Sequence, residues 1–461
     1  MKPKTTLTLF VMLIIVGAFY WLWGVKGAKQ RAEKQELAQK IVAVEPDSVD
    51  SVTLIQNGDT TVVYQRQDGK WAITYPVNTA GDQTQIDRNL NAFLDAQKQR
   101  TIATELTDLK PYGLDTPRVE VGITYNDTGK VTLLVGKENP TGSHVYVKAR
   151  ENNAIYTSDK NLATEGQKKL FDLRDRSIVE FDRNQIQKMI IARNGGQSLE
   201  FDNMNGDWRL KSPQVKAQSS QVSSVLSGLS NGQAQTYFEE TPQNLAKYGL
   251  KNPRLTLSLF ANDSTRTAAL QIGDPVDDSD SPDYYARDIS RPTVFSISNY
   301  LVSNLQKTPF EFQDKGLFDI SSGQVTDVEI TREDTTYALS KVDTAWQLTE
   351  PLQAPADPEQ AEAIARALTN LRVDSLASYT RTAPGLYGLN HPPMEVHFKV
   401  AGSDFDGFRI GRTGQGNMRF ISTDSSPYVY LIKENKLNDF RVSLESLRSS
   451  REPDSTAIAR Q

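Results

Sequence analysis

The sequence predicts an α+β protein: three tandem repeats of a mainly antiparallel sheet with a covering helix, preceded by one N-terminal transmembrane helix. Three observations lead to this prediction. First, residues 5–25 form a stretch of 21 residues without a charged side chain. Second, one series of motifs, each begun by a tryptophan, recurs at separations of 137 and 138 residues. Third, the runs between these motifs alternate apolar and polar residues and are bounded by Gly, Asn and Asp, which is typical of antiparallel hairpins.

Composition excludes several classes of protein. The chain has 461 residues, which predicts two to four domains at roughly 100–200 residues each. Lys and Arg number 52 against 57 Asp and Glu, and the net charge of -5 excludes a strongly basic nucleic-acid binder. The chain has no cysteine, so disulfides, thiolate metal sites and cysteine nucleophiles are excluded. We therefore expect no nucleic-acid partner.

Residues 1–25 are predicted to be a transmembrane anchor that contacts the membrane through residues 5–25. At about 1.5 Å per residue the uncharged stretch spans a hydrocarbon layer of about 30 Å. Tyr20, Trp21 and Trp23 stand at one end, where aromatic rings favour the interface. The alternative is a cleaved signal peptide, because Val16, Gly17 and Ala18 resemble a cleavage site. Apolar residues continue past that point, which favours the uncleaved anchor.

Charge does not decide which side of the membrane the bulk of the chain occupies. Two lysines precede the anchor, but four basic residues follow it closely, and a long domain can be translocated whatever its charge. Residues 26–48 are rich in Lys, Glu, Gln and Ala and are predicted to form a helical stalk.

The remaining chain is predicted to hold three repeat units at residues 49–181, 182–319 and 320–448, followed by a polar, disordered tail at 449–461. In each unit a proline follows the tryptophan by five residues, in the pairs Trp71 and Pro76, Trp208 and Pro213, and Trp346 and Pro351. Eleven residues after each tryptophan stands a residue that favours a helix N-cap: Asp82, Ser219 and Asp357.

An amphipathic helix is predicted to follow each cap, because apolar residues recur at helical spacing. One face carries Ile86, Leu90, Phe93 and Leu94 in the first unit, Val222, Val225, Leu226 and Leu229 in the second, and Ala361, Ile364, Leu368 and Leu371 in the third. Residues 159–173 are predicted to form a second, closing helix. Each unit therefore reads as strands, a helix, more strands and a short helix.

A Tyr-Gly-Leu motif follows each predicted helix, at Tyr112 and Gly113, Tyr248 and Gly249, and Tyr387 and Gly388. Further on, a strand ends in an apolar residue and a glycine, at Gly136, Gly273 and Gly411. The tryptophans and this motif could form a ligand platform. We interpret them instead as determinants of the fold, with the motif glycines in turns that need a positive φ.

These motifs resemble domain-of-unknown-function family 4340 over roughly residues 49–447. In this chain Asn390 and Lys251 stand where Asp115 follows the motif leucine in the first unit. The resemblance implies a single-pass protein of the bacterial inner membrane, with its bulk in the periplasm or outside, and partners among ABC transporter permease and ATPase subunits. It carries no catalytic residues to transfer.

Two other clusters are candidates for metal sites. The loop from Asp277 to Asp283 holds four carboxylates in seven residues but lacks EF-hand spacing, so a solvated loop is favoured over a weak cation site. Glu395 and His397 share a strand face and His391 lies nearby, yet no third ligand is evident. We therefore assign no catalytic, cofactor-binding or metal residue.

The predicted function is that of a non-catalytic, membrane-anchored envelope protein, an accessory or binding subunit of an ABC-type transport system. One alternative is an anchored enzyme that acts on envelope glycans through paired carboxylates. The other alternative is a purely structural spacer.

Overall fold

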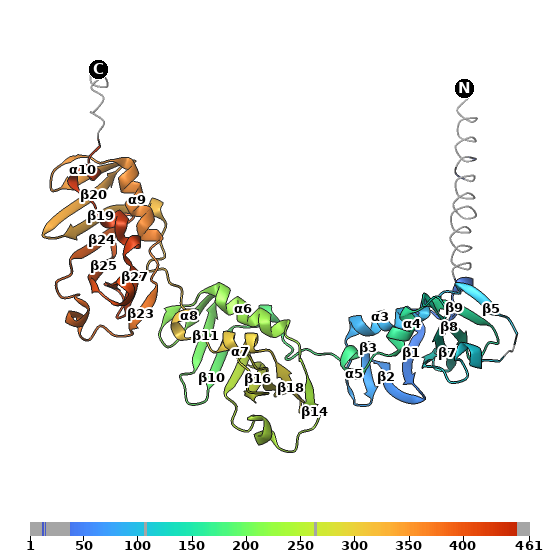
Figure 1. The fold of residues 1–461 in the computed structure, drawn as a ribbon. Coiled ribbons are helices and arrows are strands. Elements are labelled where there is room, and N and C mark those ends of the chain that lie inside the picture. The colour runs from blue at the N-terminus through green and yellow to red at the C-terminus, as the bar shows by residue number, and fades with distance from the viewer. Residues whose placement is uncertain (1–11, 13, 15–36, 106–107, 262–264, 450–461) are drawn as a thin grey trace, which may run out of the picture. The chain divides into compact units, whose positions relative to one another are not determined.

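The computed structural model describes residues 12, 14, 37–105, 108–261 and 265–449. The chain divides into two compact units, residues 1–176 and 177–461. The first unit contains one nine-stranded sheet and the second contains two, and all neighbouring strands pair antiparallel (Figure 1). This confirms the predicted three repeats of mainly antiparallel sheet.

All three sheets have one topology. In the first, the strands lie in the order β4-β3-β2-β1-β6-β7-β8-β9-β5. Their bounds are β1 (Val49–Gln56), β2 (Asp59–Gln67), β3 (Lys70–Tyr75), β4 (Thr79–Ala80), β5 (Arg100–Ala103), β6 (Val119–Tyr125), β7 (Gly129–Glu138), β8 (His144–Ala149) and β9 (Ile155–Asp159). The helix α3 (Gln83–Leu94) connects β4 to β5, which are opposite edges of the sheet. It therefore crosses one whole face.

The second and third sheets repeat this order with their own strands. The second contains β10 (Lys188–Arg193), β11 (Leu199–Met204), β12 (Asp207–Leu210), β13 (Val215–Lys216), β14 (Tyr237–Glu239), β15 (Leu255–Phe260), β16 (Arg266–Pro275), β17 (Tyr284–Asp288) and β18 (Val294–Ile297). The third contains β19 (Val325–Arg332), β20 (Thr335–Val342), β21 (Ala345–Glu350), β22 (Ala354–Pro355), β23 (Ser375–Ser378), β24 (Met394–Val400), β25 (Ser403–Thr413), β26 (Met418–Thr423) and β27 (Val429–Lys433). The covering helices are α6 (Ser219–Ser230) and α9 (Pro358–Thr369).

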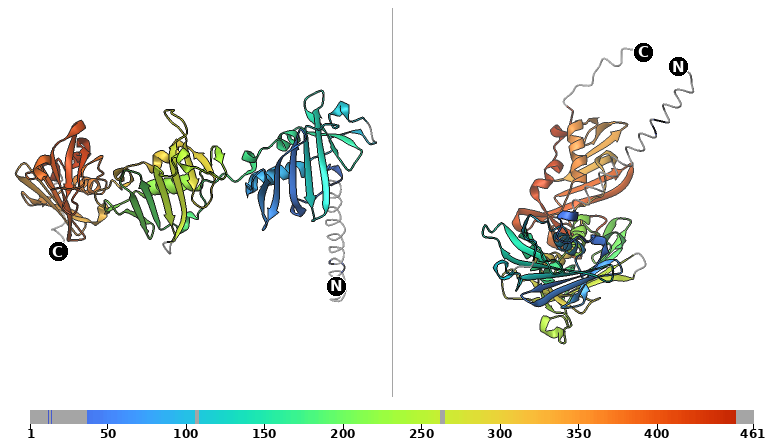
Figure 2. Two further views of the ribbon diagram at one scale, coloured as in Figure 1. Left: turned by 90° about the horizontal axis from the view of Figure 1, so that it is seen from below. Right: turned by 90° about the vertical axis from the view of Figure 1, so that its right-hand side faces the viewer.

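Each repeat has its own hydrophobic core between the sheet and these helices. Alternate strand residues face the helix, as in β19, where Val328 and Ile330 are buried and Glu329 between them is exposed. The predicted apolar helix faces are buried in all three cores. Shorter helices close each repeat: α4 (Asn161–Gly166) and α5 (Leu170–Leu173), α7 (Asn299–Leu305) and α8 (Pro309–Phe312), and the 3-10 helix η9 (Glu434–Phe440) with α10 (Leu444–Leu447). The predicted closing helix at 159–173 is thus split in two. The two views of Figure 2 show the helices layered against the sheets.

Isolated bridges join the start and the end of each repeat to the segments that flank its covering helix. The entering segment pairs after the helix, at Lys40 with Gln97, Ser177 with Gln233, and Gly316 with Arg372. The leaving segment pairs before the helix, at Gly81 with Arg174, Ala217 with Gln313, and Ala356 with Arg448. These bridges show where each repeat begins and ends.

The cores begin earlier than the predicted boundaries. Val42 and Val44 are buried in the first core, so residues 40–48 belong to the first repeat and the predicted stalk is wrong there. Only residues 37–39 of the described stalk are α-helical. Likewise Ile178 lies in the second core and Phe318 in the third, so residues ahead of the predicted starts at 182 and 320 belong to these repeats.

The N-caps agree with the sequence in two repeats. Asp82 accepts from the backbone N–H of Gln85, and Asp357 accepts from Glu359 and Gln360. In the second repeat the helix begins one position earlier relative to the tryptophan, so Gln218 is the N-cap and the predicted cap Ser219 is the first helical residue.

The predicted ends of the chain fall mostly outside the described residues. Of the predicted anchor only Met12 and Ile14 are described, and of the predicted tail only Ser449. Among the described helices none has the length and apolar character needed to cross a bilayer.

Candidate functional site

The three tryptophans occupy equivalent buried places beneath the covering helix. Trp71, Trp208 and Trp346 are 2%, 6% and 3% exposed. The indole N–H of Trp71 donates to Asp87 of α3 over 2.8 Å, and that of Trp346 donates to Glu362 of α9 over 3.0 Å. The prolines of this motif, Pro76, Pro213 and Pro351, follow cis peptide bonds in all three repeats.

A cation lies over the indole ring in the first and third repeats. Arg66 lies 4.3 Å from the ring centroid of Trp71, and Lys341 lies 5.3 Å from that of Trp346. Lys341 also binds Glu362 over 2.9 Å. The hydrogen bonds from Trp346 and Lys341 lower the pKa of Glu362. In the second repeat the cation and the acid are replaced together, by Asn203 and Ser223.

The Tyr-Gly-Leu motif ends a 3-10 helix in each repeat: η3 (Lys110–Tyr112), η5 (Leu245–Tyr248) and η7 (Pro384–Tyr387). Gly113, Gly249 and Gly388 have φ values of 66°, 67° and 71°, the left-handed region expected for them. Each motif tyrosine packs against an aromatic ring on a strand of the same sheet: Tyr112 on Tyr146 of β8, Tyr248 on Tyr285 of β17 and Tyr387 on Phe420 of β26. The ring centroids lie 5.0, 5.0 and 5.1 Å apart.

The predicted strand ends at Gly136, Gly273 and Gly411 are wrong, because β7, β16 and β25 continue for two residues past these glycines. Each glycine instead lies where the Tyr-Gly-Leu motif packs against the strand. A Cβ atom at Gly136, Gly273 or Gly411 would lie 2.3, 2.0 or 2.0 Å from the carbonyl oxygen of the motif tyrosine. Atoms cannot approach so closely, so only glycine lets the 3-10 turn seat on the strand. The sequence revealed the motif glycine and the strand glycine of each repeat, but not that the strand glycine lies against the motif.

One hollow of the described chain lies in the third repeat. It is a pocket of about 670 Å³ on the outer face of the sheet, the face turned away from α9. Strands β19, β20, β21, β24 and β25 and the loop after β26 line it. Its polar lining residues are Asp327, Glu329, Ser340, Thr349, His397, Lys399, Asp406, Asp424 and Ser425. A pocket of this volume is in the range that binds small molecules.

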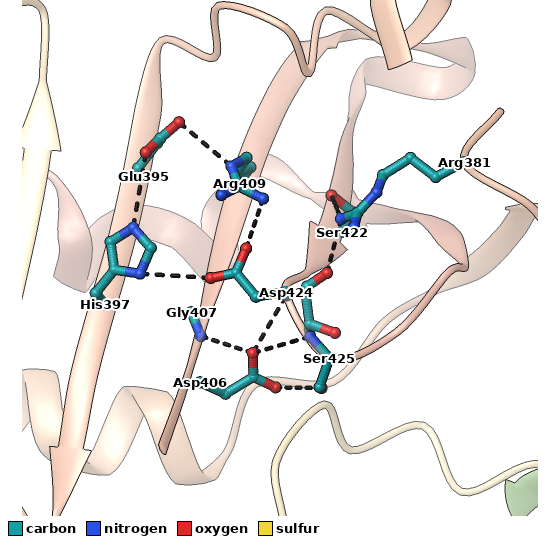
Figure 3. A network of polar contacts seen from close by, with 10 residues as sticks. Arg381, Glu395, His397, Asp406, Gly407, Arg409, Ser422, Asp424 and Ser425 are labelled. Atoms are coloured by element: carbon teal, nitrogen blue, oxygen red, sulfur yellow. Dashed lines mark hydrogen bonds and ion pairs between the residues drawn. The ribbon is translucent and has the colours of Figure 1, made fainter. Parts of the chain in front are cut away.

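A closed ring of four charged or ionisable side chains borders the pocket (Figure 3). Arg409 binds Glu395 over 3.4 Å and Asp424 over 2.5 Å. His397 lies between the same two acids, with Nε2 3.7 Å from Glu395 and Nδ1 3.4 Å from Asp424. The ring joins three strands, since Glu395 and His397 belong to β24, Arg409 to β25 and Asp424 directly follows β26.

Gly407 makes room for this ring. It pairs with His397 across β24 and β25, and a Cβ there would lie 2.4 Å from Nδ1 of His397 and 2.6 Å from the carboxylate of Asp424. A side chain at this position would separate the histidine from the acid. The ring therefore depends on one residue that has no side chain.

Asp406 holds the loop that carries Asp424. Its carboxylate accepts the backbone N–H groups of Gly407, Asp424 and Ser425 at 2.7, 3.2 and 3.2 Å. The hydroxyl of Ser425 also donates to it. Behind the loop, Arg381 donates to the buried hydroxyl of Ser422 and to the carbonyl of Thr423 (Figure 3). The wall of the pocket is thus fixed by hydrogen bonds before any ligand arrives.

The ring is specific to the third repeat. Strand register places Glu120, Gly122, Leu134 and Arg150 at the ring positions of the first repeat, and there Arg150 binds Glu120 directly. At the same positions the second repeat has Thr256, Ser258, Gln271 and Ile289. Among the three repeats, this closed ring of Glu395, His397, Arg409 and Asp424 is therefore found in the third.

The sequence places Glu395 and His397 on one face of a strand, and the structure adds Asp424 and Arg409 to this pair. Within the described residues no group of three His, Asp or Glu side chains is arranged to hold a metal ion. His391 takes no part in the ring. In the acidic loop, Asp277 accepts the N–H of Ser279 over 3.0 Å, and Val276 and Asp283 close the loop through their backbones.

Comparison with known proteins identifies the family of the chain. A search of curated proteins gave no significant match. The sequence model of a family described as "Domain of unknown function (DUF4340)" matches in three segments, residues 71–237, 208–345 and 346–452. Each segment begins at one of the three tryptophans and together they cover most of the chain. The resemblance inferred from the motifs is confirmed: the chain belongs to the DUF4340 family, in three tandem copies.

Proposed function

We propose that this protein is a non-catalytic, membrane-anchored envelope protein that binds a ligand through the third-repeat pocket, as an accessory or binding subunit of an ABC-type transport system. It is held in the bacterial inner membrane by residues 5–25, with its bulk in the periplasm or outside. The observation that carries the proposal is the pocket itself, because only one of three repeats of one fold bears this charged network.

The groups around the pocket are arranged for binding rather than for turnover. Asp424 and Glu395 are engaged by Arg409, and Asp406 is engaged by three backbone amides and Ser425. The hydroxyl of Ser425 donates to Asp406 and not to His397, so serine, histidine and acid do not form a relay. A glycosidase needs one carboxylate as acid and another as base or nucleophile, and Glu395, Asp424 and Asp406 are each held by partners within the chain. This arrangement favours binding over the carboxylate enzyme.

The test is affinity purification of the tagged full-length protein from gently solubilised membranes. The proposal expects an ABC permease or ATPase subunit to be enriched with it. Leu13→Arg places a charge in the predicted anchor and is expected to release the protein from carbonate-washed membranes and to abolish the enrichment. Recovery of the chain alone, under conditions in which a known transporter complex of the same cells stays assembled, would contradict the proposed partners.

A further inference from the structure

Glu329 presents an unengaged carboxylate in the third-repeat pocket. It lies on the outer face of β19, is exposed, and forms no hydrogen bond or ion pair with any described residue. Its neighbour across β20 is Ala338, which is too small to cover it. Asp327, two residues earlier on the same face, accepts a hydrogen bond of 2.7 Å from Ser340. Across β20 these two carboxylates face the short neutral side chains of Ala338 and Ser340, and across β24 they face His397 and Lys399.

In the second repeat, lysines and acids occupy the surface equivalent to the third-repeat pocket. There Lys211, at the position of Thr349, binds Glu200 over 2.6 Å and Asp202 over 3.3 Å. Glu200 and Asp202 stand at the positions of Ala338 and Ser340. Lys188, at the position of Asp327, binds Glu200 from the other side. Hydrogen bonds from the two lysines lower the pKa of Glu200. An ammonium group between carboxylates therefore occupies this surface in the second repeat.

The third repeat lacks these ammonium groups. Its equivalents of Lys188 and Lys211 are Asp327 and Thr349, and it adds Glu329 where the second repeat has Ile190. The β19 and β21 positions that carry two lysines in the second repeat therefore carry an acid and a threonine in the third. Lys399 also lines the pocket, opposite Asp327 in the pairing of β19 with β24, and it has a contact within the chain.

We propose that the third-repeat pocket binds a small organic molecule with a primary ammonium group, which takes the place that the Lys211 ammonium fills in the second repeat. This deepens the proposed function and rests on it, because it names the class of ligand for the same pocket. An ammonium has three donors, and the carboxylates of Glu329 and Asp327 with the Thr349 hydroxyl supply the acceptors. Because Glu329 is exposed, binding is expected to weaken as salt is added.

The experiment uses the full-length protein in detergent and isothermal titration calorimetry. The probe is 1,4-diaminobutane, and the control ligand is 1,4-butanediol, which has the same length and no charge. The diamine is expected to bind and the diol is not. Glu329→Gln should weaken binding by about fivefold or more, since it removes one charge and keeps the shape. Glu333→Gln, in the exposed turn of the same hairpin, makes the same charge change outside the pocket and should leave affinity unchanged.

A second variant tests the pocket without relying on loss of an acid. Thr349→Lys copies the second repeat and supplies an ammonium from the chain itself, so diamine binding should be lost while the far-UV spectrum and melting temperature are kept. Equal binding of diamine and diol, or unchanged binding by both Glu329→Gln and Thr349→Lys, would overturn the inference. Failure here with transporter subunits still enriched in the purification would leave the proposed function standing. Diamine binding without that enrichment would contradict the proposed partners alone.

Discussion

At the scale of single residues, the repeat depends on contacts that only one residue type allows. Gly411 lies against the carbonyl oxygen of Tyr387, so Gly411→Ala forces the 3-10 turn and the strand apart. We expect a loss of about 1–3 kcal/mol in the free energy of unfolding of this repeat. The measurement is denaturant unfolding followed by fluorescence. Gly323→Ala is the matched control, because a Cβ there meets no atom within 4 Å, and it should be neutral or slightly stabilising.

The Trp346, Lys341 and Glu362 cluster makes a prediction about pH. Two hydrogen bonds hold the pKa of Glu362 below its usual value in the folded state. The ionised form is therefore favoured by folding, and its stabilising contribution is present above the unfolded pKa of about 4.3 and is lost as the pH falls through the folded pKa. Glu362→Gln should be less stable than the parent at pH 7. The difference between their melting temperatures should shrink below pH 4, and a difference that grew on acidification would contradict this account.

Single residues also show what the sequence could and could not reveal. The three tryptophans, the prolines and the positive φ of Gly113, Gly249 and Gly388 follow from spacing and from the steric freedom of glycine. The ring in the third repeat does not, because Arg409 and Asp424 meet Glu395 and His397 only through the pairing of β24, β25 and β26. The available signal was weak: Gly407 stands in a strand interior, where glycine often marks a close approach.

At the scale of elements, a buried polar network joins three elements of the first repeat. Tyr64 of β2 donates to Asn89 of α3 over 2.9 Å, and Asn89 donates to the backbone and side chain of Glu165 in α4. Burial raises the pKa of Tyr64, and the charges of Glu165 and Asp87 raise it further. The second repeat has Phe201 and Val225 at the positions of Tyr64 and Asn89, so there the sheet and the covering helix pack through apolar side chains alone at these two positions.

This difference predicts a non-additive pair of substitutions. Asn89→Val alone leaves the Tyr64 hydroxyl and the Glu165 side chain without their buried partner, at a cost of about 1–3 kcal/mol. Adding Tyr64→Phe should recover a large part of that loss, because the hydroxyl that needed a partner is gone. A double-mutant cycle of unfolding free energies measures the coupling. Strictly additive losses would show that the hydroxyl is not held by Asn89.

The elements themselves were largely predictable, and the exceptions have physical causes. Alternation marked the strands and helical spacing marked α3, α6 and α9, because each has one buried face. The predicted N-cap at Ser219 was wrong, because the second repeat has one residue fewer between Pro213 and its helix. The prediction counted a fixed distance from the tryptophan, and the missing residue lies in a turn that keeps both flanking motifs in place. The stalk was predicted too long, because composition favoured helix while the burial of Val42 and Val44 decided the outcome.

At the scale of the whole molecule, separate cores predict separate responses. The three hydrophobic cores share no residue, and the first repeat forms a compact unit of its own. We therefore expect Gly411→Ala to speed amide hydrogen exchange in β24 and β25 while β1, β6 and β7 keep their parent rates. Mass spectrometry of exchanged peptides gives the measurement. Faster exchange throughout residues 49–173 would instead mean that the chain unfolds as one cooperative block.

The strand order has a practical consequence for cloning. Each family segment begins at a tryptophan, and the second, residues 208–345, ends just before the next one. In each folded sheet the first two strands of the repeat, such as β10 and β11, precede that tryptophan in the sequence, and β10 lies near the middle of its sheet. A gene fragment encoding residues 208–345 would lack β10 and β11 and would carry β19 and β20 as an unmatched hairpin. We expect this fragment to be recovered as inclusion bodies. A fragment that starts before Ser177 and ends after Phe312 should be soluble, because it keeps every ladder of the second sheet intact.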